Sequence, residues 1–166
     1  MKLDLSHAHI GIQVENLDSA TQELNRLFGF TFAEPASPDI QVDVPGSSIR
    51  EALSGSLTVT RQGPPFIEVS QDDPESKIFR TNPGEQISFH HLGFWVDNLQ
   101  AHIDELVAAG YPIEGAGLND FGEYRYSYHI VQGLRIELAD LRVRDPFEEW
   151  GCIGKPNMKA LFHPGS

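Results

Sequence analysis

The chain has 166 residues, of which 40% are apolar and 22% are charged, a composition typical of a globular domain. Its 24 acidic and 12 basic side chains give a formal net charge of −12, which repels a phosphate backbone and argues against nucleic acid as a partner. The sequence contains no run of about 18 apolar residues that could span a bilayer, and no secretory leader follows Met1. We therefore expect no membrane association and a cytoplasmic location.

The sequence contains an internal repeat. Residues 9–24 align without a gap with residues 91–106, and seven of the sixteen aligned positions are identical. Each copy begins with the pattern His-x-Gly-x-x-Val, at His9 and at His91. This pattern predicts a short strand with the histidine and the glycine on one face and apolar residues on the other. The chain is therefore expected to be one domain built from two copies of a smaller unit.

A helix is expected after the strand in each copy. In the first copy apolar residues such as Leu17, Ala20 and Leu24 recur at helical spacing, and Gly29 stands where a helix ends in the left-handed conformation. The second copy repeats this pattern from Leu99 to Gly110. Each helix is expected to pack on the apolar face of its strand, which leaves the histidine face free.

Both copies then change to the period of two that is typical of strands. The expected strands are 56–61, 66–69, 124–131 and 134–138. If Gln132 and Gly133 form a two-residue turn, Tyr128 lies directly opposite Glu137. The closing strand of each copy contains an Ile-Glu pair, which ends in Glu68 and in Glu137.

The remaining segments set the expected boundaries. These are a first module at 1–70 with an inserted loop at 33–48, a connector at 71–86, a second module at 87–141, and a short helix with a tail at 142–166. The inserted loop is rich in proline, and two roles stay open for it, a lid or a cover for an exposed sheet edge. The short helix is expected to pack Phe147 and Trp150 against the body of the protein or against a neighbouring subunit.

Four side chains stand at equivalent positions of the two copies and suggest a metal site. His9 and Glu68 from the first copy would face His91 and Glu137 from the second. Two imidazoles and two carboxylates suit a divalent cation such as Zn, Ni, Co, Mn or Fe. One strand histidine is usually structural, but the recurrence of both residue types at matching places favours a shared site.

These patterns resemble the vicinal oxygen chelate superfamily, the group of glyoxalase I, methylmalonyl-CoA epimerase, extradiol dioxygenases and bleomycin-resistance proteins. The resemblance covers residues 7–140 and rests on the His-x-Gly-x-x-Val strands, the Asn-Leu helix starts and the closing Ile-Glu pairs. It implies an α+β fold in which two tandem βαβββ modules form a curved mixed sheet, a cup, with helices on the outer face. The implied ligands are His9, Glu68, His91 and Glu137, a set similar to those of bacterial glyoxalase I and methylmalonyl-CoA epimerase.

Strand alternation adds residues that would line the cup. The candidates for substrate binding are Tyr128, Tyr126, Trp95 and Gln13. The two tyrosines share the face of Glu137, and the other two share the faces of the histidines. The neighbouring His90 is expected to point to the opposite side, toward the helices.

A divalent ion can polarise a carbonyl, and a carboxylate that leaves the ion can take a proton from the adjacent carbon. We therefore expect a metal-dependent isomerase, epimerase or glyoxalase-type lyase that acts on a small carbonyl compound, thioesters included, through a metal-stabilised enediolate. Glu137 or Glu68 is the expected catalytic base, and the choice between them stays open. Two alternatives are a non-catalytic small-molecule binding (resistance) protein and an Fe(II)-dependent ring-cleaving dioxygenase. The expected partners are a small-molecule substrate and a second copy of the chain in a homodimer.

Overall fold

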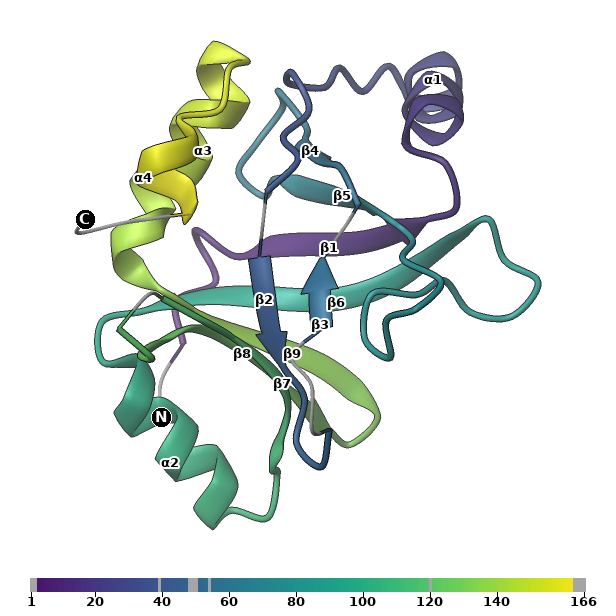
Figure 1. The fold of residues 1–166 in the computed structure, drawn as a ribbon. Coiled ribbons are helices and arrows are strands. Elements are labelled where there is room, and N and C mark those ends of the chain that lie inside the picture. The colour runs from purple at the N-terminus through teal and green to yellow at the C-terminus, as the bar shows by residue number, and fades with distance from the viewer. Residues whose placement is uncertain (1–2, 39, 48–50, 54, 120, 163–166) are drawn as a thin grey trace.

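The computed structural model describes residues 3–38, 40–47, 51–53, 55–119 and 121–162, with the backbone only at 40 and 51–53. Within this part of the chain, nine strands form one sheet. The strands are β1 (His9–Val14), β2 (Ile40–Asp43), β3 (Glu51–Leu53), β4 (Leu57–Val59), β5 (Ile67–Gln71), β6 (Ile87–Val96), β7 (Ile113–Leu118), β8 (Tyr124–Val131) and β9 (Leu134–Asp140). The helices are α1 (Leu17–Phe28), α2 (Leu99–Ala108), the 3₁₀ turn η1 (Leu141–Val143), α3 (Arg144–Ile153) and α4 (Met158–Phe162). The predicted α+β fold with a curved mixed sheet is confirmed (Figure 1).

The strand order places the candidate ligands together. The order is β3-β2-β7-β8-β9-β6-β1-β5-β4. The two histidine strands, β1 and β6, are antiparallel neighbours, and each has a parallel glutamate strand, β5 or β9, on its other side. Gly11 pairs with Glu68 and Gly93 pairs with Glu137, so the two copies use the same register. The repeat is therefore visible as an approximate twofold relation across the centre of the sheet.

Two details of local structure agree with the sequence pattern. In the β8–β9 hairpin Val131 pairs with Leu134 and Tyr128 pairs with Glu137, as the two-residue turn predicts. Helix α1 ends at Gly29, whose φ of 72° is left-handed and whose N–H donates to the carbonyl of Asn25.

The helices α1 and α2 pack on the apolar sides of their strands. Leu17 and Ala20 of α1 pack against Val14 and Val69. In α2 the buried residues are Leu99, Ile103 and Leu106, which pack with Phe94 and Leu138. Burial of a side chain of this size contributes roughly 1.5 to 3 kcal/mol, so both helices are held to the outer side of the cup. None of the helices in the described ranges is long and apolar enough to cross a membrane.

The segment 33–48, expected as a loop, contains strand β2. This strand crosses to the second copy and pairs with β7 through Val42–Gly117 and Asp43–Ala116. An unpaired strand edge exposes hydrogen-bonding groups, and β2 covers that edge of β7. Before this crossing, the chain runs beside β4 through isolated bridges at Phe32 and Ala36.

The prediction that His90 points toward the helices is wrong. Along the β1–β6 pair, Gly11 is opposite His91 but Ile12 is opposite Phe89, so His90 is the extra residue of a β-bulge. Because a bulge interrupts the alternation of side chains, the His90 ring stacks on Phe79 of the connector and contacts His91.

Candidate metal and substrate site

Three of the four candidate ligands meet at the centre of the cup. His9, His91 and Glu137 are buried, and their ligand atoms lie within 4.8 Å of one another. The Nε2 of His9 is 2.8 Å and the Nε2 of His91 is 3.5 Å from Oε2 of Glu137, and the two nitrogens are 3.3 Å apart. Donors that share one ion at bonds of about 2.1 Å stand roughly 3.0 to 3.4 Å apart. The three side chains therefore fit a divalent cation.

The two motif glycines make this packing possible. A Cβ on Gly11 would lie 2.0 Å from Cε1 of His91, and a Cβ on Gly93 would lie 2.1 Å from Cε1 of His9. His9 pairs with Gly93, and Gly11 pairs with His91. Each copy therefore supplies the glycine over which the other copy's histidine ring lies, which is a physical reason for the His-x-Gly pattern in both.

The charges of Glu137 and His91 suit a ligand set, whereas in the metal-free protein the hydrogen bond and the charge of Glu137 outweigh burial and raise the pKa of His9. Burial alone would raise the pKa of Glu137, but His91 and the hydrogen bond from His9 outweigh burial and lower that pKa to about 2. Burial holds the pKa of His91 well below its ordinary value, although Glu137 acts in the other direction. The carboxylate is therefore ionised and His91 is neutral, which are the protonation states that metal ligands need.

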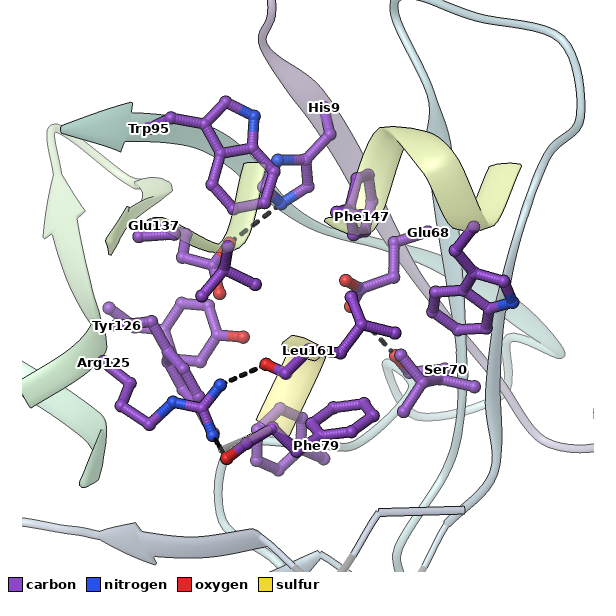
Figure 2. Close-up of a pocket in the computed structure, with 16 residues that line it drawn as sticks. His9, Glu68, Ser70, Phe79, Trp95, Arg125, Tyr126, Glu137, Phe147 and Leu161 are labelled. Atoms are coloured by element: carbon purple, nitrogen blue, oxygen red, sulfur yellow. Dashed lines mark hydrogen bonds and ion pairs between the residues drawn. The ribbon is translucent and has the colours of Figure 1, made fainter. Parts of the chain in front are cut away.

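Glu68 faces the same cavity but does not belong to the three-donor group. Figure 2 shows its carboxylate pointing into the cavity from the side opposite Glu137, with Ser70 beside it. The Oγ of Ser70 donates to Oε1 of Glu68 at 3.2 Å. Burial and the charge of Glu137 raise the pKa of Glu68 to about 7. Two carboxylates with pKa values pushed apart are typical of acid–base sites.

The cavity has a volume of about 90 Å³. Its wall contains three of the predicted substrate-binding residues, Trp95, Tyr126 and Tyr128, together with His9 and both glutamates. Gln13 and His91 do not line it; both are buried. Gln13 lies on β1, where it pairs with Ser70 of β5 and Ser88 of β6, and among the described residues its side-chain amide has no hydrogen-bond partner.

Several wall residues were not identified from the sequence. These are Leu57, Ser70, Phe79, Arg125, Ala139, Val143, Phe147, Trp150, Leu161 and Phe162. Arg125 of β8 donates hydrogen bonds to the carbonyl oxygens of Leu161 and Phe162, which ties α4 across one side of the cavity (Figure 2). The spacing of Phe147 and Trp150 predicted a helix packed on the body or on a neighbouring subunit, and α3 packs on the body, against β4. No sequence signal indicated that this helix would close the cup.

Comparisons with known proteins agree with the fold. Residues 8–128 match the model of the glyoxalase/bleomycin resistance protein/dioxygenase superfamily. Methylmalonyl-CoA epimerase from Mycobacterium tuberculosis is similar in structure, with 20% identity, a TM-score of 0.53, and coverage of 80% of this chain and 85% of the other.

Two further solved structures are similar. Hypothetical protein BH1468 from Bacillus halodurans has 17% identity, a TM-score of 0.56, and coverage of 84% of this chain and 93% of its own. Methylmalonyl-CoA epimerase from Streptomyces coelicolor, in complex with 2-nitronate-propionyl-CoA, has 13% identity, a TM-score of 0.56, and coverage of 84% and 98%. No curated protein matches the sequence. The match over residues 8–128 shows that the chain belongs to the glyoxalase/bleomycin resistance protein/dioxygenase superfamily, also called the vicinal oxygen chelate superfamily.

Proposed function

We propose that the protein is a metal-dependent isomerase or epimerase that moves a proton on the carbon next to a carbonyl group. The observation that carries this proposal is a second, partly buried carboxylate, Glu68, which lines the same cavity as His9 and Glu137. A carboxylate that only binds solvent usually lies on the outer surface, so the place of Glu68 in the cavity wall favours a chemical role.

The four candidate residues have two proposed roles, metal ligand and catalytic base. His9, His91 and Glu137 would hold a divalent ion, which when bound would supply Lewis-acid polarisation of the substrate carbonyl. Glu68 takes the proton from the carbon and returns it, because its raised pKa lets it exist in both protonation states near neutral pH. We thus choose Glu68 as the base and Glu137 as the permanent ligand. Ser70 holds the Glu68 carboxylate on its own side of the cavity.

The walls restrict the substrate. Trp95, Tyr126 and Tyr128 surround the reacting centre, and α4 with Arg125 closes the side of the cup. Burial raises the pKa of the Tyr128 phenol well above its ordinary value, so the hydroxyl stays a hydrogen-bond donor. A volume of about 90 Å³ accepts only a group of a few atoms. The reacting end of a small carbonyl compound or thioester fits this size.

The experiment is solvent deuterium exchange by the Co²⁺-loaded protein without oxygen, with methylmalonyl-CoA and with small 2-hydroxyketones as probes. Glu68→Gln is expected to keep Co²⁺ affinity within a few-fold and to lose at least 100-fold in exchange rate. Glu137→Gln, the matched change, is expected to lose Co²⁺ affinity. Retained exchange in Glu68→Gln would contradict the assignment of the base. Purified protein that takes up less than about a tenth of an equivalent of any divalent metal after reconstitution would exclude metal catalysis altogether.

One observation favours a second candidate. Two histidines and one carboxylate are the ligand set of non-haem Fe(II) oxygenases, and the three-donor group has this composition. An Fe(II)-dependent ring-cleaving dioxygenase would consume oxygen with a catechol and would be inactive without air. Oxygen uptake with no deuterium exchange would select this function, and probe binding with neither reaction would indicate a binding protein.

A further inference from the structure

Two hydrogen bonds connect His91 to the backbone through its neighbour His90. The Nε2 of His90 lies 2.9 Å from the carbonyl oxygen of Ile78, and its Nδ1 lies 2.8 Å from the Nδ1 of His91. Both rings are buried, and they cross at 81°. Neither ring lines the cavity, so this contact is separate from the substrate-facing surface.

The positions of the protons follow from these partners. A carbonyl oxygen only accepts, so the Nε2 of His90 carries a hydrogen. In a neutral imidazole the other nitrogen, Nδ1 of His90, is then an acceptor. The bond between the two Nδ1 atoms must therefore be donated by His91. This leaves the Nε2 of His91 with a free lone pair, and that atom faces His9 and Glu137.

A doubly protonated His90 would reverse this direction, but its surroundings disfavour a charge. The ring stacks on Phe79 with centroids 5.6 Å apart and meets Tyr128 edge-on at 5.4 Å. A buried imidazolium without a carboxylate bonded to it is costly, and His90 has none among its hydrogen-bond partners. The neutral form with the hydrogen on Nε2 satisfies both ring nitrogens.

The equivalent histidine of the first copy lacks this arrangement. Ala8 stands before His9, where His90 stands before His91. Among the described residues the Nδ1 of His9 has no hydrogen-bond partner, and its Nε2 lies 2.8 Å from Glu137. In the metal-free protein the Nε2 of His9 therefore donates to the carboxylate. The two histidines of the repeat, His9 and His91, therefore differ in the hydrogen-bond partners of their ring nitrogens.

We propose that His90 is a positioning residue, which fixes the hydrogen of His91 on Nδ1 and thereby presents the Nε2 of His91 as a ready metal ligand. The expected effect of His90 on metal affinity rests on the proposed function, in which His91 is a metal ligand. The tautomer itself does not, because it is a property of the metal-free chain.

The first experiment measures that tautomer by NMR in ¹⁵N-histidine-labelled protein without metal. We expect His91 to carry its hydrogen on Nδ1 and His90 to carry its hydrogen on Nε2. A hydrogen on the Nε2 of His91 would overturn the proposal. Because the measurement uses the unaltered protein, a loss of folding in a variant cannot affect it.

The second experiment compares two substitutions that each keep one half of the imidazole. His90→Asn keeps an acceptor near the place of Nδ1, and His90→Gln keeps a donor toward Ile78 but loses the acceptor. We expect His90→Asn to bind Co²⁺ within about threefold of the unaltered protein and His90→Gln to bind 10- to 100-fold more weakly. Equal losses in both variants would contradict the tautomer argument.

His129→Asn is the matched control, because His129 is equally buried and bonded to Ser127 and to the carbonyl of Tyr111 away from the ligands. It is expected to lower thermal stability without a change of Co²⁺ affinity. If the unaltered protein shows the expected tautomer but binds no Co²⁺, the role of His90 in orienting His91 stands and the proposed function fails. The two proposals are thus separated.

Discussion

Replacement of Gly11 by alanine tests the close contact between the two histidine strands. The new Cβ would lie 2.0 Å from Cε1 and 2.2 Å from Nδ1 of the His91 ring, where ordinary contacts begin at 3.4 Å. The ring would have to move by about 1.4 Å, the difference between 3.4 and 2.0 Å. It is bonded to His90 on one side and packs on Tyr128 on another, so little room is left.

The expected cost has two parts. Overpacking of a filled core costs about 1 to 3 kcal/mol, and loss of the hydrogen bond between His91 and His90 adds about 1 kcal/mol. We therefore expect Gly11→Ala to lower the free energy of unfolding of the metal-free protein by about 2 to 4 kcal/mol. Urea denaturation measures this value. Displacement of His91 is also expected to lower Co²⁺ affinity at least tenfold.

A double-mutant cycle isolates the cause. In the His91→Ala background the ring is absent, and Gly11→Ala should cost less by about 2 kcal/mol. Gly115→Ala is a suitable control because its Cβ would also meet an atom at 2.0 Å, but that atom is the flexible end of Ile78 and can move away. The reasoning would be refuted if Gly11→Ala cost the same with and without the His91 ring.

Two further predictions concern opposite sides of the cavity. In the metal-free protein the pKa of Glu68 is raised from 4.5 to about 7, so its stabilising contribution is present below pH 4.5 and is lost as the pH rises through 7. Glu68→Gln should therefore stabilise the protein at pH 8 by up to about 3 kcal/mol and change little at pH 4, as urea denaturation with a chelator at both values would test. Arg125→Gln removes the bonds to α4 and should raise the rate of tryptic cleavage after Lys159 about tenfold, whereas Arg135→Gln, which breaks the ion pair between β9 and Glu114 of β7, should not. Equal cleavage in both variants would show that Arg125 does not hold α4.

The centre of the site was predictable because its positions depend on strand alternation and on the repeat. His9, His91 and Glu137 lie on strands whose period of two is visible in the sequence, and the turn at Gln132 set the register of Tyr128. Periodicity needs only local information. A repeat adds the long-range fact that the two copies pair with each other.

The parts that were not predicted depend on contacts between distant segments. The placement of α3 over the cup is set by the packing of Phe147 and Trp150 on β4, which no local pattern reports. The orientation of the His90 side chain was not predicted because one extra residue in β6 shifts the alternation of side chains, and nothing in the sequence marks that bulge. Strand β2 was not predicted from the sequence because it is paired with β7, a strand of the other copy of the repeat.

The repeat also does not reveal why its two glutamates differ. Glu68 and Glu137 have the same register against Gly11 and Gly93, yet only Glu137 reaches the histidines. Two residues farther along each strand, the first copy has Ser70 and the second has Ala139. The serine hydroxyl donates to Glu68, and an alanine offers no such bond to Glu137. We infer that this one difference keeps Glu68 apart from the donors.

Ser70→Ala is therefore predicted to release Glu68 toward the other three ligands. Loss of one hydrogen bond to a carboxylate, worth about 1.5 to 3 kcal/mol, removes what holds the side chain, and a fourth oxygen donor should raise Co²⁺ affinity by about tenfold or more. The visible absorption of bound Co²⁺ should change with its coordination, and deuterium exchange should fall because the base is now a ligand. Ser88→Ala, on the strand opposite Gln13, is the control. Unchanged Co²⁺ affinity and absorption in Ser70→Ala would mean that Glu68 is held in place by the fold of β5 and not by this bond.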